Sequence, residues 1–110
     1  MVPSNMQRIV EQPAGDGDVF SGGTRVGRVR YHLAIYQHFS EHEGESVPAN
    51  FEVEGRVTAI DGVDVAECHR GGVELTLQLV DGRRLDLLII SDDGGIRSTG
   101  RSLYAPEERE

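Results

Sequence analysis

The chain has 110 residues, a formal net charge of −8 and a single cysteine. This length suits one domain whose core can stand without metal or disulfides, and one cysteine excludes an internal disulfide bond. The acidic balance argues against a general binder of nucleic-acid phosphates, so we do not expect nucleic acid as a partner.

The first 18 residues contain two prolines and two glycines, which interrupt regular elements. We expect this N-terminal segment to form one short strand, at Met6–Val10, or to be disordered. Residues 19–104 are predicted to form the β domain, and residues 105–110 a charged tail. The N-terminus lacks the basic and apolar regions of a signal peptide, and no apolar run reaches the roughly 18–20 residues of a membrane span. A cytoplasmic protein that does not enter the membrane is therefore expected.

The longest alternating segment, Thr24–Phe39, is predicted to be one strand. At about 3.3 Å per residue it would extend for about 50 Å, longer than a typical strand of a small domain. We therefore expect a bulge or bend, and Gly27 is the residue best suited to it.

An acidic loop is predicted at Ser40–Asn50, and a second alternating strand follows from Phe51 to Ala59. A register in which Phe39 lies opposite Phe51 places the apolar side chains of both strands on the same face, so we favour it. The same register places Leu33 opposite Val57 and His38 opposite Glu52.

The segment Ile60–Gly62 is predicted to be a three-residue turn that leads into a strand over Val63–Glu67. No convincing amphipathic helix is recognised in the chain.

Two alternating apolar stretches in Val73–Ser91 predict a β-hairpin around Asp81-Gly82. A two-residue loop would place apolar side chains opposite polar ones. A three-residue loop, Val80–Gly82, keeps the apolar face intact and pairs Leu77 with Leu85 and Leu75 with Leu87.

The second strand of this hairpin is apolar on both faces, because Leu88 and Ile90 alternate with Leu87 and Ile89. Strands of this kind are usually covered on both sides. Either the N-terminal segment or a second copy of the chain could cover the face of Leu88 and Ile90. A second copy is the favoured hypothesis, so we expect a homo-oligomer formed through these residues.

Six to seven short strands separated by turn residues predict an all-β fold. We expect a single-domain antiparallel meander that forms a small barrel or a two-layer sandwich.

The sharpest metal candidate is the group His38, Glu41 and His42, since imidazole and carboxylate groups bind divalent ions such as zinc. A solvated acidic loop explains the same residues and is favoured. Metal binding would be revealed by a zinc-dependent rise in melting temperature that His42→Ala abolishes.

A second candidate is the polar face of the long strand, with Arg28, Arg30, His32 and Tyr36. Arginine and aromatic side chains on a sheet can bind a small ligand or single-stranded nucleic acid. The spacing of the predicted strands in Val53–Leu79 also resembles that of an OB-type half-barrel. Ordinary cross-strand pairing with glutamates on the neighbouring strand is the favoured explanation.

No catalytic arrangement is recognisable, so we expect a binding or interaction module and not an enzyme, with self-association as the leading hypothesis and no required cofactor. The alternatives are a β domain that binds a divalent metal or small ligand through residues 38–45, and an OB-like binder of single strands.

Overall fold

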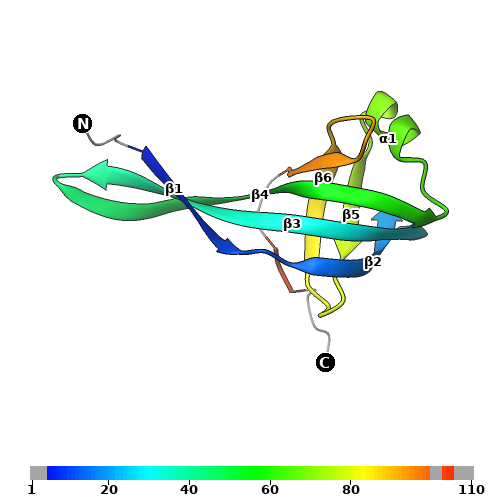
Figure 1. Cartoon of the computed structure of the whole chain (residues 1–110), viewed down its shortest axis with the longest axis horizontal. Helices are drawn as coiled ribbons and strands as arrows, with labels where there is room; N and C mark the ends of the chain where they lie inside the picture. Colours follow the sequence, from blue (N-terminus) through cyan, green and yellow to red (C-terminus); the bar gives the residue numbers. More distant parts are fainter. Residues whose placement is uncertain (1–4, 100–102, 106–110) are drawn as a thin grey trace.

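The computed structural model describes residues 5–99 and 103–105, with the side chains of residues 5–7, 40–42 and 46–50 left undescribed. Its elements, in chain order, are β1 (Asn5–Glu11), β2 (Ala14–Ser21), β3 (Thr24–His42), β4 (Glu45–Asp61), α1 (Val65–Gly71), β5 (Glu74–Gln78), β6 (Arg84–Ile89) and β7 (Gly95–Ser98). All strand pairings are antiparallel (Figure 1). The prediction of an all-β, antiparallel fold in a single domain is confirmed.

The sheet consists of two consecutive three-stranded meanders, β2–β3–β4 and β5–β6–β7. They join along two edges, where β2 pairs with β5 and β4 pairs with β7. Because β3 also pairs with β4, the sheet closes into a ring, and one continuous sheet takes the place of two separate layers. β1 lies outside the ring, against the far half of β3.

The ring is filled by side chains that alternate with outward-facing ones along each strand. Among the side chains that the structure describes, fourteen buried apolar residues form this core: Val19, Val29, Tyr31, Leu33, Ile35, Val53, Val57, Leu75, Leu77, Leu79, Leu85, Leu87, Ile89 and Ile96. The Tyr31 hydroxyl accepts a hydrogen bond of 3.0 Å from the Val80 backbone N–H, so the one polar group of this core is satisfied.

The hairpin of β5 and β6 has the predicted register, with Leu75 opposite Leu87 and Leu77 opposite Leu85. Gly82 has a φ of 94°, the left-handed conformation expected of it, and its N–H donates to the Leu79 carbonyl at 3.0 Å. The three-residue turn is confirmed.

The predicted loop over Ser40–Asn50 is wrong, because β3 and β4 continue through it to a two-residue turn. Glu43 and Gly44 have φ values of 53° and 83°, the two positive angles of a type I′ turn. The outer part of this hairpin, with β1 beside it, extends beyond the ring as an arm, formed by β1, residues 36–42 and residues 45–52 (Figure 1).

The predicted register of β3 and β4 is also wrong. Gln37 lies opposite Phe51 and Tyr36 opposite Glu52, and a bulge between Gln37 and Phe39 changes the pairing farther along the arm. His38 nevertheless contacts the predicted residue diagonally, with 3.0 Å between His38 Nε2 and Glu52 Oε1.

A bulge is present next to Gly27, where a bulge or bend was expected. The pairing of β2 with β3 shifts between Val19, opposite Gly27, and Phe20, opposite Arg25. A Cβ atom on Gly27 would lie 2.4 Å from the Asp61 carbonyl oxygen, so the close approach of β3 and β4 requires glycine here.

The strand predicted at Val63–Glu67 is wrong, because the chain forms α1 there. Asp64 caps the helix by accepting a hydrogen bond of 3.0 Å from the Glu67 N–H, and Gly72 ends it with a φ of 62°. α1 has seven residues. Within residues 5–99 and 103–105 we find no helix of the length and apolar character needed to cross a membrane.

Arg83 forms ion pairs with both β1 and the turn between β5 and β6. Its Nη2 lies 2.6 Å from Glu11 Oε2, and its Nε lies 2.9 Å from Asp81 Oδ2. The hydrogen bond from the Arg83 side chain lowers the pKa of Glu11, and bonds from the Arg83 backbone N–H and guanidinium lower the pKa of Asp81. The C-terminal end of β1 is thus held beside the ring.

Candidate functional site

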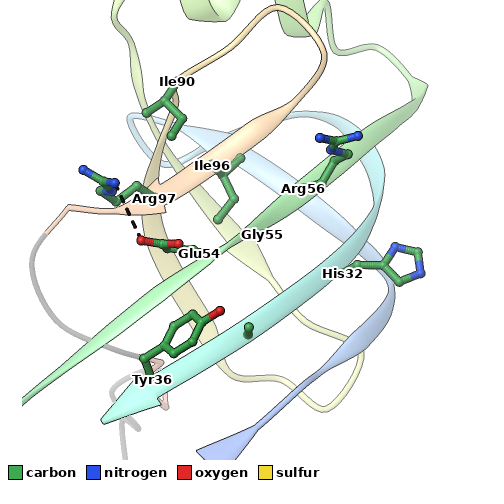
Figure 2. A pocket seen from close by; sticks show the side chains of 9 residues that line it. His32, Tyr36, Glu54, Gly55, Arg56, Ile90, Ile96 and Arg97 are labelled. Carbon is green, nitrogen blue, oxygen red and sulfur yellow. Dashed lines mark ion pairs between the residues drawn. The ribbon is translucent and has the colours of Figure 1, made fainter. Parts of the chain in front are cut away.

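A pocket of about 380 Å³ lies on the outside of the ring, across β3, β4 and β7 (Figure 2). We call it the outer pocket. Its lining residues are His32, Ala34, Tyr36, Glu54, Gly55, Arg56, Ile90, Ile96 and Arg97. Its size lies within the range of about 300–1,000 Å³ that is usual for small-molecule sites.

Strand register explains why these residues meet. His32 lies opposite Arg56, and Ala34 lies opposite Glu54, so outward-facing side chains of both strands surround a point where β3 carries only a methyl group. Gly55 lies next to this point, where it pairs with the buried residues Leu33 and Ile96. A Cβ atom at Gly55 would lie 2.2 Å from the His32 carbonyl oxygen, so the close contact of the two strands needs glycine at this position.

Two arginines flank this depression, Arg56 from β4 and Arg97 from β7 (Figure 2). Arg97 lies between two carboxylates, with 3.6 Å from its Nη2 to Glu54 Oε2 and 3.5 Å from its Nε to Glu52 Oε2, and the Arg56 Nη2 lies 3.4 Å from Asp93 Oδ2. Close charge-assisted bonds measure about 2.7–2.9 Å, so all three ion pairs are loose. The two side chains are 62% and 57% exposed, which leaves guanidinium donors accessible to a ligand.

The apolar part of the outer pocket comes from Tyr36 and Ile90. Tyr36 is half-buried and lies at the end of the pocket opposite His32 (Figure 2). Ile90 is 48% exposed. An aromatic ring and an aliphatic side chain beside two guanidinium groups can accommodate a molecule with a flat body and an anionic group.

The predicted ligand face divides into two parts. His32 and Tyr36 line the outer pocket, whereas Arg28 and Arg30 do not. Arg30 pairs with Asp16 on β2, with 3.0 Å between Arg30 Nε and Asp16 Oδ1. Arg56, Glu54 and Arg97 were not among the predicted site residues, because only the register of β3, β4 and β7 brings them together.

The metal hypothesis places His38 and His42 four residues apart on β3. In a strand this spacing separates their Cα atoms by about 13 Å, whereas in a helix it would place them on neighbouring turns. Among the side chains that the structure describes, no three His, Cys, Asp or Glu residues gather as a metal site. The side chains of Glu41 and His42 lie outside that description, so metal binding stays a prediction.

The predicted self-association residues differ in exposure. Leu88 is partly buried, and Ile90 is exposed and lines the outer pocket. These two residues therefore form a small part of the outer surface, and Ile90 is shared with the candidate ligand site.

Cys68 is partly buried and packs against the core. Burial raises the pKa of its thiol, and the carboxylates of Glu67 and Asp64 raise it further. A protonated thiol is a poor nucleophile, so Cys68 gains no catalytic activation from this environment.

The chain matches no protein-family model, and no curated protein or solved structure is significantly similar to it. No functional residue can be transferred from a relative, so the assignment of a site depends on the outer pocket itself.

Proposed function

We propose that the protein is a binding module, and not an enzyme, whose outer pocket takes a small ligand with a flat body and an anionic group. The observation that carries this proposal is that Arg56, Arg97 and Tyr36 surround the depression at Ala34 and Gly55, with the two arginines on opposite sides of Ile96 (Figure 2). A guanidinium group would bind the anion, and the Tyr36 ring would pack against the flat body.

The position of the outer pocket supports the proposal. β3 and β4 are the second and third strands of the ring in chain order, and in OB-folds the face of strands 2 and 3 binds oligonucleotides and oligosaccharides. By analogy of position, the outer face of β3 and β4 is the corresponding surface of this ring.

The first test compares adenosine monophosphate with adenosine as probes, by isothermal titration calorimetry. We expect the phosphate to tighten binding about three- to tenfold, because both guanidinium groups are more than half exposed and exposed ion pairs are of modest strength. The double variant Arg56→Gln/Arg97→Gln should remove this advantage and leave weak binding of adenosine.

Arg25→Gln is the matched control, because Arg25 is a half-exposed arginine paired with Asp18, outside the outer pocket. Equal affinities for the two probes, or an equal loss in the control, would contradict the proposal. Tight, steeply salt-dependent binding of a single-stranded oligonucleotide would support the OB-like alternative instead.

The second candidate function is self-association through the arm. Phe51 shares its side of β4 with the buried Val53, so the core face of the sheet continues onto the arm, where Phe51 is 45% exposed. A second copy that packs against this face would cover Phe51. Ile9 of β1 is exposed as well, but it lies opposite Tyr36 and therefore on the other side of the arm.

Self-association predicts a dimer or larger species in sedimentation velocity at micromolar concentration. Phe51→Ser should give a monomer if copies meet through the arm, and Ile90→Asp should do so if they meet through the predicted surface of Leu88 and Ile90. A wild-type monomer across the concentration range would exclude both interfaces.

A further inference from the structure

A second cavity, separate from the outer pocket, lies at the end of the ring beside α1. We call it the end groove. Its volume is about 430 Å³, and its lining residues are Ser21, Val26, Gly62, Val63, Asp64, Glu67, Cys68, Gly71, Val73 and Leu75. The end groove shares no residue with the outer pocket.

The strand pairing explains why the ring is open here. β2 and β5 share three residue pairs, and the last is Phe20 with Thr76. Leu75 lies beyond that pair, on the side where α1 is located. α1 contains no buried residue, so it lies across the end of the ring without closing it.

The walls of the end groove are mainly aliphatic. Val26 and Val73 remain 37% and 39% exposed, and Val63 and Cys68 pack against the core. Leu75 is buried at the base. Exposed valines around a concave surface can bind an aliphatic chain, because burying apolar surface is favourable.

The charged side chains that line the end groove, among the residues that the structure describes, are all negative. Asp64 and Glu67 are carboxylates, and none of the described residues that line the end groove is a cation. Both carboxylates raise the pKa of the neighbouring Cys68 thiol, as expected where the local potential is negative. A ligand with a positive end would complement this lining.

We propose that the end groove binds a small amphipathic cation, with an aliphatic body against Val26, Val63 and Val73 and an ammonium group beside Asp64 and Glu67. The proposal does not depend on the outer pocket, because the two sites differ in location and in the sign of their charge.

The test uses three probes with the same six-carbon chain: hexylamine, 1-hexanol and hexanoate. Their binding is followed through backbone amide shifts in ¹H–¹⁵N spectra of the full chain. Hexylamine should shift the amides of Val26, Val63 and Val73 and bind about three- to tenfold more tightly than 1-hexanol, given the modest strength of exposed ion pairs. Hexanoate should bind more weakly than either.

The double variant Asp64→Asn/Glu67→Gln removes both charges while Asn keeps the capping ability of residue 64. It should lose the preference for hexylamine and still bind 1-hexanol, with an unchanged melting temperature. Glu43→Gln/Glu45→Gln, at the exposed tip of the arm, removes the same charge elsewhere and should keep the preference. Equal binding of the amine and the alcohol by the wild type, a preference that survives in the Asp64/Glu67 variant, or shifts confined to other parts of the chain would overturn the proposal.

Discussion

Leu85→Ala should lower the free energy of unfolding by about 2–5 kcal/mol, the range for removing a fully buried leucine side chain. Leu85 has no exposed surface and faces Leu77 inside the ring. Its neighbours belong to strands of a closed sheet, which limits how far they can move to fill the cavity. Urea unfolding followed by circular dichroism measures this change.

Leu88→Ala, on the outward face of the same strand, is the matched control. Leu88 is partly buried, so Leu88→Ala should lower the free energy of unfolding by no more than about half the loss expected for Leu85→Ala. Equal losses for the two variants would mean that the outward face of β6 is as well covered as the core, which would favour a partner or a second copy over it.

Gly94→Ala should also destabilise the fold strongly, for two separate reasons. Gly94 has a φ of 97°, which costs a residue with a side chain about 1 kcal/mol or more. A Cβ atom there would also lie 2.1 Å from the Val57 carbonyl oxygen, beside the hydrogen bond of 2.9 Å from the Val57 N–H to the Gly94 carbonyl. Displacing this contact between β4 and the turn before β7 should add about 1–3 kcal/mol.

Gly82→Ala separates these two contributions. Gly82 has a nearly identical φ of 94°, but no atom lies within 4 Å of the position of its added Cβ. It should therefore show the conformational cost alone. If the two alanine variants unfold at the same urea concentration, close packing of Gly94 against β4 contributes nothing to stability.

The hairpin of β5 and β6 could be predicted in detail because the residues that determine its register lie close together in the sequence. Alternating leucines define the inward face, and Asp81-Gly82 supplies a residue suited to positive φ. Because side chains alternate between the two faces of a strand, only a three-residue loop keeps Leu77 opposite Leu85 on the inward face. The structure has that register.

α1 was missed although its capping signals are present in the sequence. Asp64 precedes Glu67 by three residues, and Gly72 follows the basic residues His69 and Arg70, which is the pattern of a short capped helix. With seven residues, α1 is too short for its apolar spacing to outweigh the alternation of Val63 and Val65, which resembles a strand.

The outer pocket depends on long-range register, which the sequence did not reveal. Glu43-Gly44 is an uncommon two-residue turn, and the bulge between Gln37 and Phe39 has no composition signal. The pairing of β7 with β4 is a contact between distant segments that no local pattern indicates, so Arg97 could not be placed beside Glu54 and Arg56. His32 and Tyr36 could be selected because they are outward-facing residues of one strand.

The most direct test of the proposed binding function is an amide-resolved titration of the full chain with adenosine monophosphate. Binding in the outer pocket predicts saturable shifts of the amides of Ala34, Gly55 and Ile96, which line the pocket, and unchanged amides at Val26 and Val73 in the end groove. Shifts that do not saturate, or that map to the arm or the end groove and leave Gly55 unaffected, would contradict it.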